Sequence, residues 1–142
     1  MQIANRPVPA TTGNAVVLIY RLLASALALG VLVESVFASQ GLFNSKPEMI
    51  DGHRRLGNLL GVVTVLTLGV AIYCWRKGRF SPAPMIRGTV IVVLIVIQII
   101  LGYATRDSTN AIVWHIPTGV ALMGLATANA ALAWVTPTAR RA

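Results

Sequence analysis

The sequence has 142 residues, of which 56% are hydrophobic and 11% are charged, and its mean hydropathy is +0.72. Water-soluble domains carry about 25% charged residues, and a soluble fold of this size could not bury so much apolar surface. The formal net charge of +8 does not indicate a nucleic-acid partner, because the basic residues stand at the ends of apolar runs. The composition indicates an integral membrane protein.

Four apolar runs are long enough to cross a bilayer, whose hydrocarbon core of about 30 Å needs roughly 20 helical residues. They cover residues 15–38, 56–75, 88–104 and 111–135. The first run exceeds the roughly 7–15 apolar residues of a signal peptide, so we interpret it as a retained helix. Continuous apolar runs favour helices over barrel strands. We therefore predict an all-α, integral membrane four-helix bundle, antiparallel and up-down-up-down, with cytoplasmic tails over residues 1–14 and 136–142.

The segments between the runs contain residues that favour turns. Residues 40–52 include Gly41, Asn44 and Pro47 and predict a loop. Residues 76–87 predict a basic hairpin, and residues 106–110 predict a short polar turn that caps the fourth helix. Such short connections make successive helices antiparallel.

The distribution of charge predicts the orientation of the bundle. One side of the membrane holds eight basic residues and no acidic side chain: Arg6, Arg21, Arg76, Lys77, Arg79, Arg87, Arg140 and Arg141. The other side holds four basic residues (Lys46, Arg54, Arg55 and Arg106) and three acidic residues (Glu48, Asp51 and Asp107). Cytoplasmic segments carry the excess of Lys and Arg. The first side, with both termini, is therefore predicted to be cytoplasmic.

The two histidines are the candidate ligands of a metal. His53 precedes the second run and His115 lies in the first turns of the fourth, so both imidazoles are expected at similar depth near the outer face. Two imidazoles on different helices of a bundle are a common way to hold haem iron axially. Two helices in direct contact are about 8–10 Å apart, which is too close to hold the macrocycle between them. The two helices are therefore expected to splay or to stand diagonally.

Several neighbours fit the same interpretation. Arg54 and Arg55 offer planar donors for haem propionates. Glycines that leave room for a flat ring follow each histidine on its own helix face: Gly57, Gly61 and Gly119. The alternatives stay open at this point, because interfacial histidines are often solvated, arginines contact lipid headgroups, and glycines four residues apart pack helices.

Two further polar residues lie inside the predicted spans. Glu34 stands about one turn from the outer end of the first run, at the depth of the histidines. It is predicted to accept a hydrogen bond from a ligand imidazole or to pair with an arginine. Gln98, in the middle of the third run, needs a polar partner in another helix or in the site.

Two segments resemble the haem A synthase superfamily: DGHRRLG, residues 51–57, and VIQIILGYATRDSTNAIVWHIPTGVALMGLA, residues 96–126. Those proteins contain two four-helix halves with a histidine pair in each, so the resemblance implies one half standing alone, with His53 and His115 as axial ligands. The layout is also similar to that of small four-span bacterial membrane proteins. The resemblance implies an acidic residue three positions before the first histidine for synthase activity, where this chain has Ile50.

Together these features predict a small bacterial inner-membrane protein that binds one b-type haem per chain or bundle and transfers electrons. The expected partners are membrane lipid, a quinone or a larger respiratory redox complex, and a second copy in a homodimer, but no nucleic acid. An electron carrier or an accessory subunit is favoured over a stand-alone enzyme. The alternatives are a non-catalytic accessory subunit of a larger membrane complex and a half-length haem A synthase-like enzyme. A transporter is the least favoured reading, since no second repeat is present.

Overall fold

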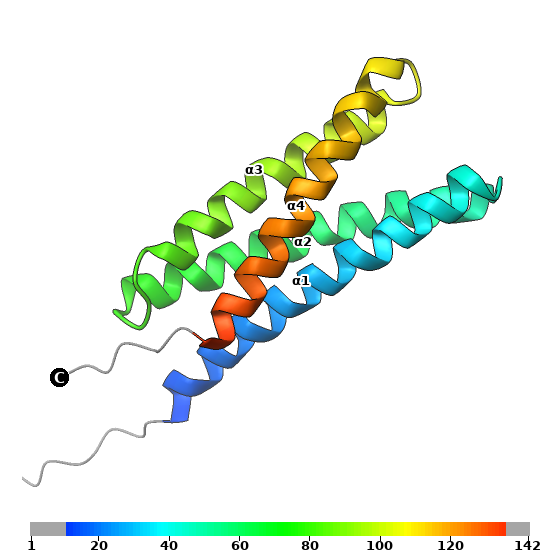
Figure 1. Ribbon diagram of the computed structural model, residues 1–142. Coiled ribbons are helices and arrows are strands. Elements are labelled where there is room, and N and C mark those ends of the chain that lie inside the picture. The colour runs from blue at the N-terminus through cyan, green and yellow to red at the C-terminus, as the bar shows by residue number, and fades with distance from the viewer. Residues whose placement is uncertain (1–10, 136–142) are drawn as a thin grey trace, which may run out of the picture.

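The computed structural model describes residues 11–135, and almost all of them are helical (Figure 1). The helices are α1 (Thr11–Phe43), α2 (Pro47–Arg76), α3 (Ala83–Ala104) and α4 (Thr109–Val135). The described residues contain no strand. The prediction of an all-α bundle of four helices is confirmed. Residues 1–10 and 136–142, which include Arg6, Arg140 and Arg141 of the charge count, lie outside the described residues.

Successive helices run in opposite directions, so the connections gather at two ends of the bundle. We call the end with residues 44–46 and 105–108 the hairpin end, and the end with residues 77–82 and the start of α1 the basic end. Figure 1 shows the α1–α2 and α3–α4 hairpins diverging toward the hairpin end. Helix α1 begins and α4 ends at the basic end.

The predicted loop over residues 40–52 is wrong, because α1 continues to Phe43 and α2 already begins at Pro47. Proline is favoured in the first helical turn, where its missing N–H would have no partner anyway. Glu48 adds a negative charge near the positive end of the helix dipole. As a result His53 lies within α2 and not before it. Likewise α3 begins at Ala83, five residues before the predicted span.

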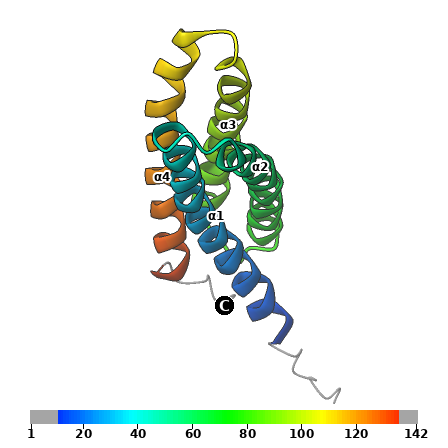
Figure 2. The ribbon, with the colours of Figure 1, turned by 90° about the vertical axis from the view of Figure 1, so that its right-hand side faces the viewer.

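Each helix packs against two neighbours. Helix α1 packs against α2 and α4, and α3 packs against the same two helices, whereas no Cα atoms of the diagonal pairs α1–α3 and α2–α4 lie within 8 Å of each other among the described residues (Figure 2). Helices α2 and α4, which carry the two histidines, therefore stand diagonally in the bundle.

Apolar side chains fill the middle of the bundle and also cover its outside. The central core combines Leu27, Val31, Leu60, Ile91, Ile95, Leu122 and Ala126. Large side chains such as Leu29 and Val120 are 62% and 69% exposed. All four helices are long and apolar enough to cross a membrane, and an apolar exterior is stable only in lipid. The protein is a multi-pass membrane protein.

Candidate functional site

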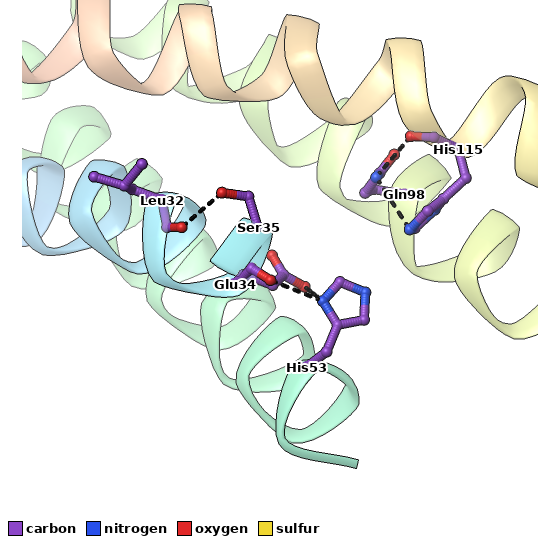
Figure 3. Close-up of polar contacts among 6 residues, drawn as sticks. All are labelled: Leu32, Glu34, Ser35, His53, Gln98 and His115. Atoms are coloured by element: carbon purple, nitrogen blue, oxygen red, sulfur yellow. Dashed lines mark hydrogen bonds and ion pairs between the residues drawn. The ribbon is translucent and has the colours of Figure 1, made fainter. Parts of the chain in front are cut away.

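The two histidines converge from diagonal helices toward the same space near the hairpin end. The ring centroids of His53 on α2 and His115 on α4 are 6.1 Å apart, and the ring planes are 89° apart. Figure 3 shows the two imidazoles on facing sides of this space, each with its own partner. The sequence predicted only that the two imidazoles lie at similar depth, and in the structure the two rings lie close to each other.

His53 is oriented by Glu34 of α1. Its Nδ1 lies 3.3 Å from the backbone carbonyl oxygen of Glu34 and 3.5 Å from the carboxylate Oε1 (Figure 3). Both oxygens are acceptors, so Nδ1 must carry the hydrogen and donate it. The Nε2 lone pair of His53 is then available to a metal, in the arrangement usual for histidine ligands.

His115 is held by Gln98 of α3. Thr118 Oγ1 donates a hydrogen bond to Gln98 Oε1 at 2.6 Å, which turns the amide nitrogen of Gln98 toward His115. That nitrogen donates to the backbone carbonyl oxygen of His115 at 2.9 Å and lies 3.4 Å from its ring Nε2 (Figure 3). Gln98 thus contacts the site, as predicted.

The second ring nitrogen of His115 has no partner. Nδ1 is buried and makes no hydrogen bond to any described residue. Buried polar atoms are almost always hydrogen-bonded, and an exception calls for an explanation such as a ligand. The ring itself packs over Gly102, where an added Cβ would stand 3.1 Å from His115 Cε1. The backbone of α3 therefore leaves just enough room for this imidazole.

A cavity of about 400 Å³ joins the two histidines and is lined by all four helices. Its volume falls within the range of about 300–1,000 Å³ that small-molecule sites occupy. Most of the lining surface is apolar, although nine of the seventeen lining residues carry polar or titratable side chains: Glu34, His53, Arg54, Asn58, Gln98, Tyr103, Thr105, Arg106 and His115. A cavity with a largely apolar surface and convergent polar groups is the usual form of a binding site for a small molecule.

The arginines of the site differ from the predicted pair. Arg54 lines the cavity and contacts Asp51 with its Nη1 at 3.2 Å. Arg55 is exposed and does not line the cavity. Arg106, which follows α3, lines the cavity instead and lies over the ring of Tyr103. The two cationic groups of the cavity thus come from opposite hairpins.

The three predicted glycines make room for side chains. A Cβ at Gly57 would stand 2.6 Å from Glu34 Oε1, and one at Gly119 would stand 2.8 Å from Gln98 Nε2. At Gly61 the nearest atom is Ile99 Cδ1, at 3.2 Å. Gly57 and Gly119 therefore act on the site through the residues that orient the histidines, and Gly61 packs α2 on α3.

The donor set suits haem better than a bare metal ion. The described residues contain no cluster of three or more His, Cys, Asp or Glu side chains, whereas a zinc site needs three or four protein ligands. Haem needs only axial ligands from the protein. An iron between two imidazoles sets their ring centres about 6 Å apart when each metal–nitrogen bond is about 2 Å. The spacing of 6.1 Å fits such a ligand. Nδ1 of His115 gives no such support, because Nε2 faces the donor nitrogen of Gln98 and Nδ1 is then the protonated nitrogen of the neutral ring.

The sequence analysis did not predict that Thr118, Gly102 and Arg106 belong to the site. The position of Arg106 could have indicated it, because this residue follows the helix of Gln98 at the same depth as the histidines. No sequence pattern indicates Thr118 or Gly102, since their contribution depends on how α3 and α4 face each other.

No protein-family model matches the chain, and neither curated proteins nor solved structures gave a match. The resemblance to the haem A synthase superfamily stays a prediction based on two short segments.

Proposed function

We propose that the protein is a small membrane cytochrome that holds one b-type haem between His53 and His115 and transfers electrons within the membrane. The observation that carries this proposal is the approach of two imidazoles from diagonal helices to a centroid distance of 6.1 Å at one apolar cavity. A bound haem would supply an iron that takes up and releases one electron at a time.

The residues around the histidines have roles that follow from their contacts. Glu34 fixes the tautomer of His53 through its backbone carbonyl oxygen, and Gln98 fixes the position of His115. Arg54 and Arg106 are the cavity cations suited to the propionates of haem. Ile95, Ile99 and other apolar lining residues exclude water, which limits side reactions of a redox centre.

Electron transfer is favoured over a synthase-like reaction by the residue at position 50. Ile50 lines the cavity where the resemblance implies a carboxylate for catalysis. A carboxylate is present at Glu34, but it contacts His53. We infer a bacterial inner-membrane location with the basic end in the cytoplasm. The haem then faces outward, where a quinone or a larger redox complex would exchange electrons with it.

Absorption spectroscopy of protein purified from a bacterial host supplied with a haem precursor tests this proposal. We expect a Soret band and the reduced spectrum of a six-coordinate, bis-histidine haem, at one haem per chain. His53→Ala or His115→Ala should abolish that spectrum while far-UV circular dichroism keeps its helical signal. A haem-replete preparation without a Soret band would refute the proposal, as would a spectrum that survives both replacements.

Two neighbouring arginines provide a matched control. Both arginines are exposed, but Arg54→Gln removes a cation that lines the cavity, whereas Arg55→Gln removes one that does not. A charge-assisted hydrogen bond contributes about 1.5–3 kcal/mol, so Arg54→Gln should weaken haem retention about tenfold or more. Arg55→Gln should leave it unchanged. Equal losses would show that the arginines act only through general charge.

A further inference from the structure

An apolar groove of about 440 Å³ lies between α2 and α3, separate from the cavity of the two histidines. Aliphatic side chains of both helices form its walls, among them Val62, Val65, Leu66, Val92, Val96 and Ile99. Val62, Val65 and Leu66 are each more than half exposed, so the groove opens toward the surrounding lipid.

The groove adjoins the histidine cavity. Asn58 of α2 and two side chains of α3, Ile95 and Ile99, line both. A molecule that lies in the groove therefore reaches the edge of the cavity from the lipid side, without passing through water.

Asn58 is the polar side chain of this groove, and it is exposed within the predicted span. Its Nδ2 donates to the hydroxyl of Tyr103 at 3.0 Å. An amide nitrogen carries two hydrogens and a hydroxyl carries one, yet neither the second N–H of Asn58 nor the O–H of Tyr103 has an acceptor among the described residues. Polar side chains in a membrane require partners, so this pair offers two unused donors to a ligand.

We propose that the groove binds an isoprenoid quinone, with a ring carbonyl at Asn58 and Tyr103 and the tail between α2 and α3. A quinone carbonyl accepts hydrogen bonds and donates none, which matches two unused donors. An apolar, branched tail matches walls of valine, leucine and isoleucine. The choice of a quinone among tailed carbonyl compounds rests on the proposed electron transfer, whereas the groove and its two donors do not.

A phospholipid matches the same features less well. Asn58 and Tyr103 are neutral, whereas a phosphate is best bound by arginine or lysine. Asn58 also follows His53 by five residues, which places it about 7–8 Å further from the hairpin end along α2. The phosphate of a phospholipid stays in the headgroup layer, but a quinone ring has no charge to hold it there.

Equilibrium binding of a tritium-labelled benzoquinone with a decyl tail, to the full chain in phosphatidylcholine nanodiscs, tests the donors. Tyr103→Phe removes only the hydroxyl and should weaken binding about fivefold, the effect of one hydrogen bond. Tyr73→Phe is the matched control, because Tyr73 is similarly exposed and lies on α2 near the basic end (43% against 47%). It should leave the affinity unchanged.

Two valines of α3 test the groove itself. Val96→Phe places a ring in the space of the tail and should weaken binding about tenfold, comparable to the cost of overpacking. Val93→Phe is the matched control, since Val93 is exposed to a similar extent (52% against 48%) but does not line the groove. Should Val96→Phe fail to fold, Val65→Phe on the facing wall makes the same test.

A double variant, His53→Ala with His115→Ala, separates this proposal from the cytochrome. Neither histidine lines the groove, so the double variant should bind the quinone without a Soret band. Wild-type protein with a Soret band but no quinone binding would overturn the groove site alone. Equal effects within either matched pair would overturn it too, as would displacement of the quinone by decane or by phosphatidylglycerol at equal concentration.

Discussion

Gln98 connects the third and fourth helices at the point where His115 stands. Its amide oxygen accepts from Thr118 and its nitrogen donates to the carbonyl oxygen of His115. Hydrogen bonds between membrane helices contribute about 0.6 kcal/mol on average, up to about 1.7, so this pair does more for orientation than for stability. Gly119 makes the arrangement sterically possible.

Gly119→Ala therefore places a methyl group 2.8 Å from an amide nitrogen that is already fixed by hydrogen bonds. We expect the free energy of unfolding to fall by about 1 kcal/mol, measured by SDS titration in mixed micelles. Gly124→Ala is the control on the same helix, because a Cβ there would meet nothing within 4 Å. Equal stability of both variants would contradict the contact.

The two histidines and their partners Glu34 and Gln98 could be predicted from the sequence, but the way in which these partners fill the site could not. Two histidines at matched depth follow from position along the chain alone. The assignment of glycines to a flat ligand failed to anticipate Glu34 and Gln98, which occupy the room at Gly57 and Gly119. Which side chain enters such a gap depends on helix rotation, and a single sequence gives no measure of that.

At the level of elements, α1 has two faces that composition does not distinguish. Leucines occur all round this helix, yet Leu27 is 1% exposed in the core and Leu29 is 62% exposed. In a water-soluble helix, polar residues on one side indicate that the opposite side is buried. A membrane helix lacks this signal, because lipid and core are equally apolar.

Leu27→Ala should lower the free energy of unfolding by about 2–4 kcal/mol, since it removes buried methyl groups and leaves a cavity. Leu29→Ala changes the same residue type two positions later, on the lipid side, and should cost less than about 0.5 kcal/mol. SDS titration monitored by circular dichroism gives both values. A larger loss for Leu29→Ala would mean that the rotation of α1 is wrong.

The sequence predicted that four helices exist more reliably than it predicted where they end. Hydropathy detects the part of a helix that crosses hydrocarbon, and it predicted the second span from residue 56. Helix α2 nevertheless begins at Pro47, because Pro47 and Glu48 favour a helix start outside the apolar stretch. The difference matters for function, since it makes His53 part of a rigid element.

For the whole molecule, the charge difference between the two ends predicts the orientation in the membrane. In a Cys74→Ala background, Asn44→Cys places a thiol at the hairpin end and Ser81→Cys places one at the basic end. A membrane-impermeant maleimide should label Asn44→Cys in intact spheroplasts and Ser81→Cys only after lysis, because basic segments stay in the cytoplasm. The reverse labelling pattern would invert the proposed side of the haem.

The closest backbone contacts between helices form a closed ring, α1–α2–α3–α4, and the diagonal pairs meet only through side chains among the described residues. Side chains fill the space between diagonal helices in the middle of the bundle and at the basic end, through the clusters around Leu27 and Tyr20, but the hairpin end encloses a cavity. Any ligand held by His53 and His115 would join α2 to α4 across that cavity, so that binding would stiffen one end of the protein and leave the other unchanged.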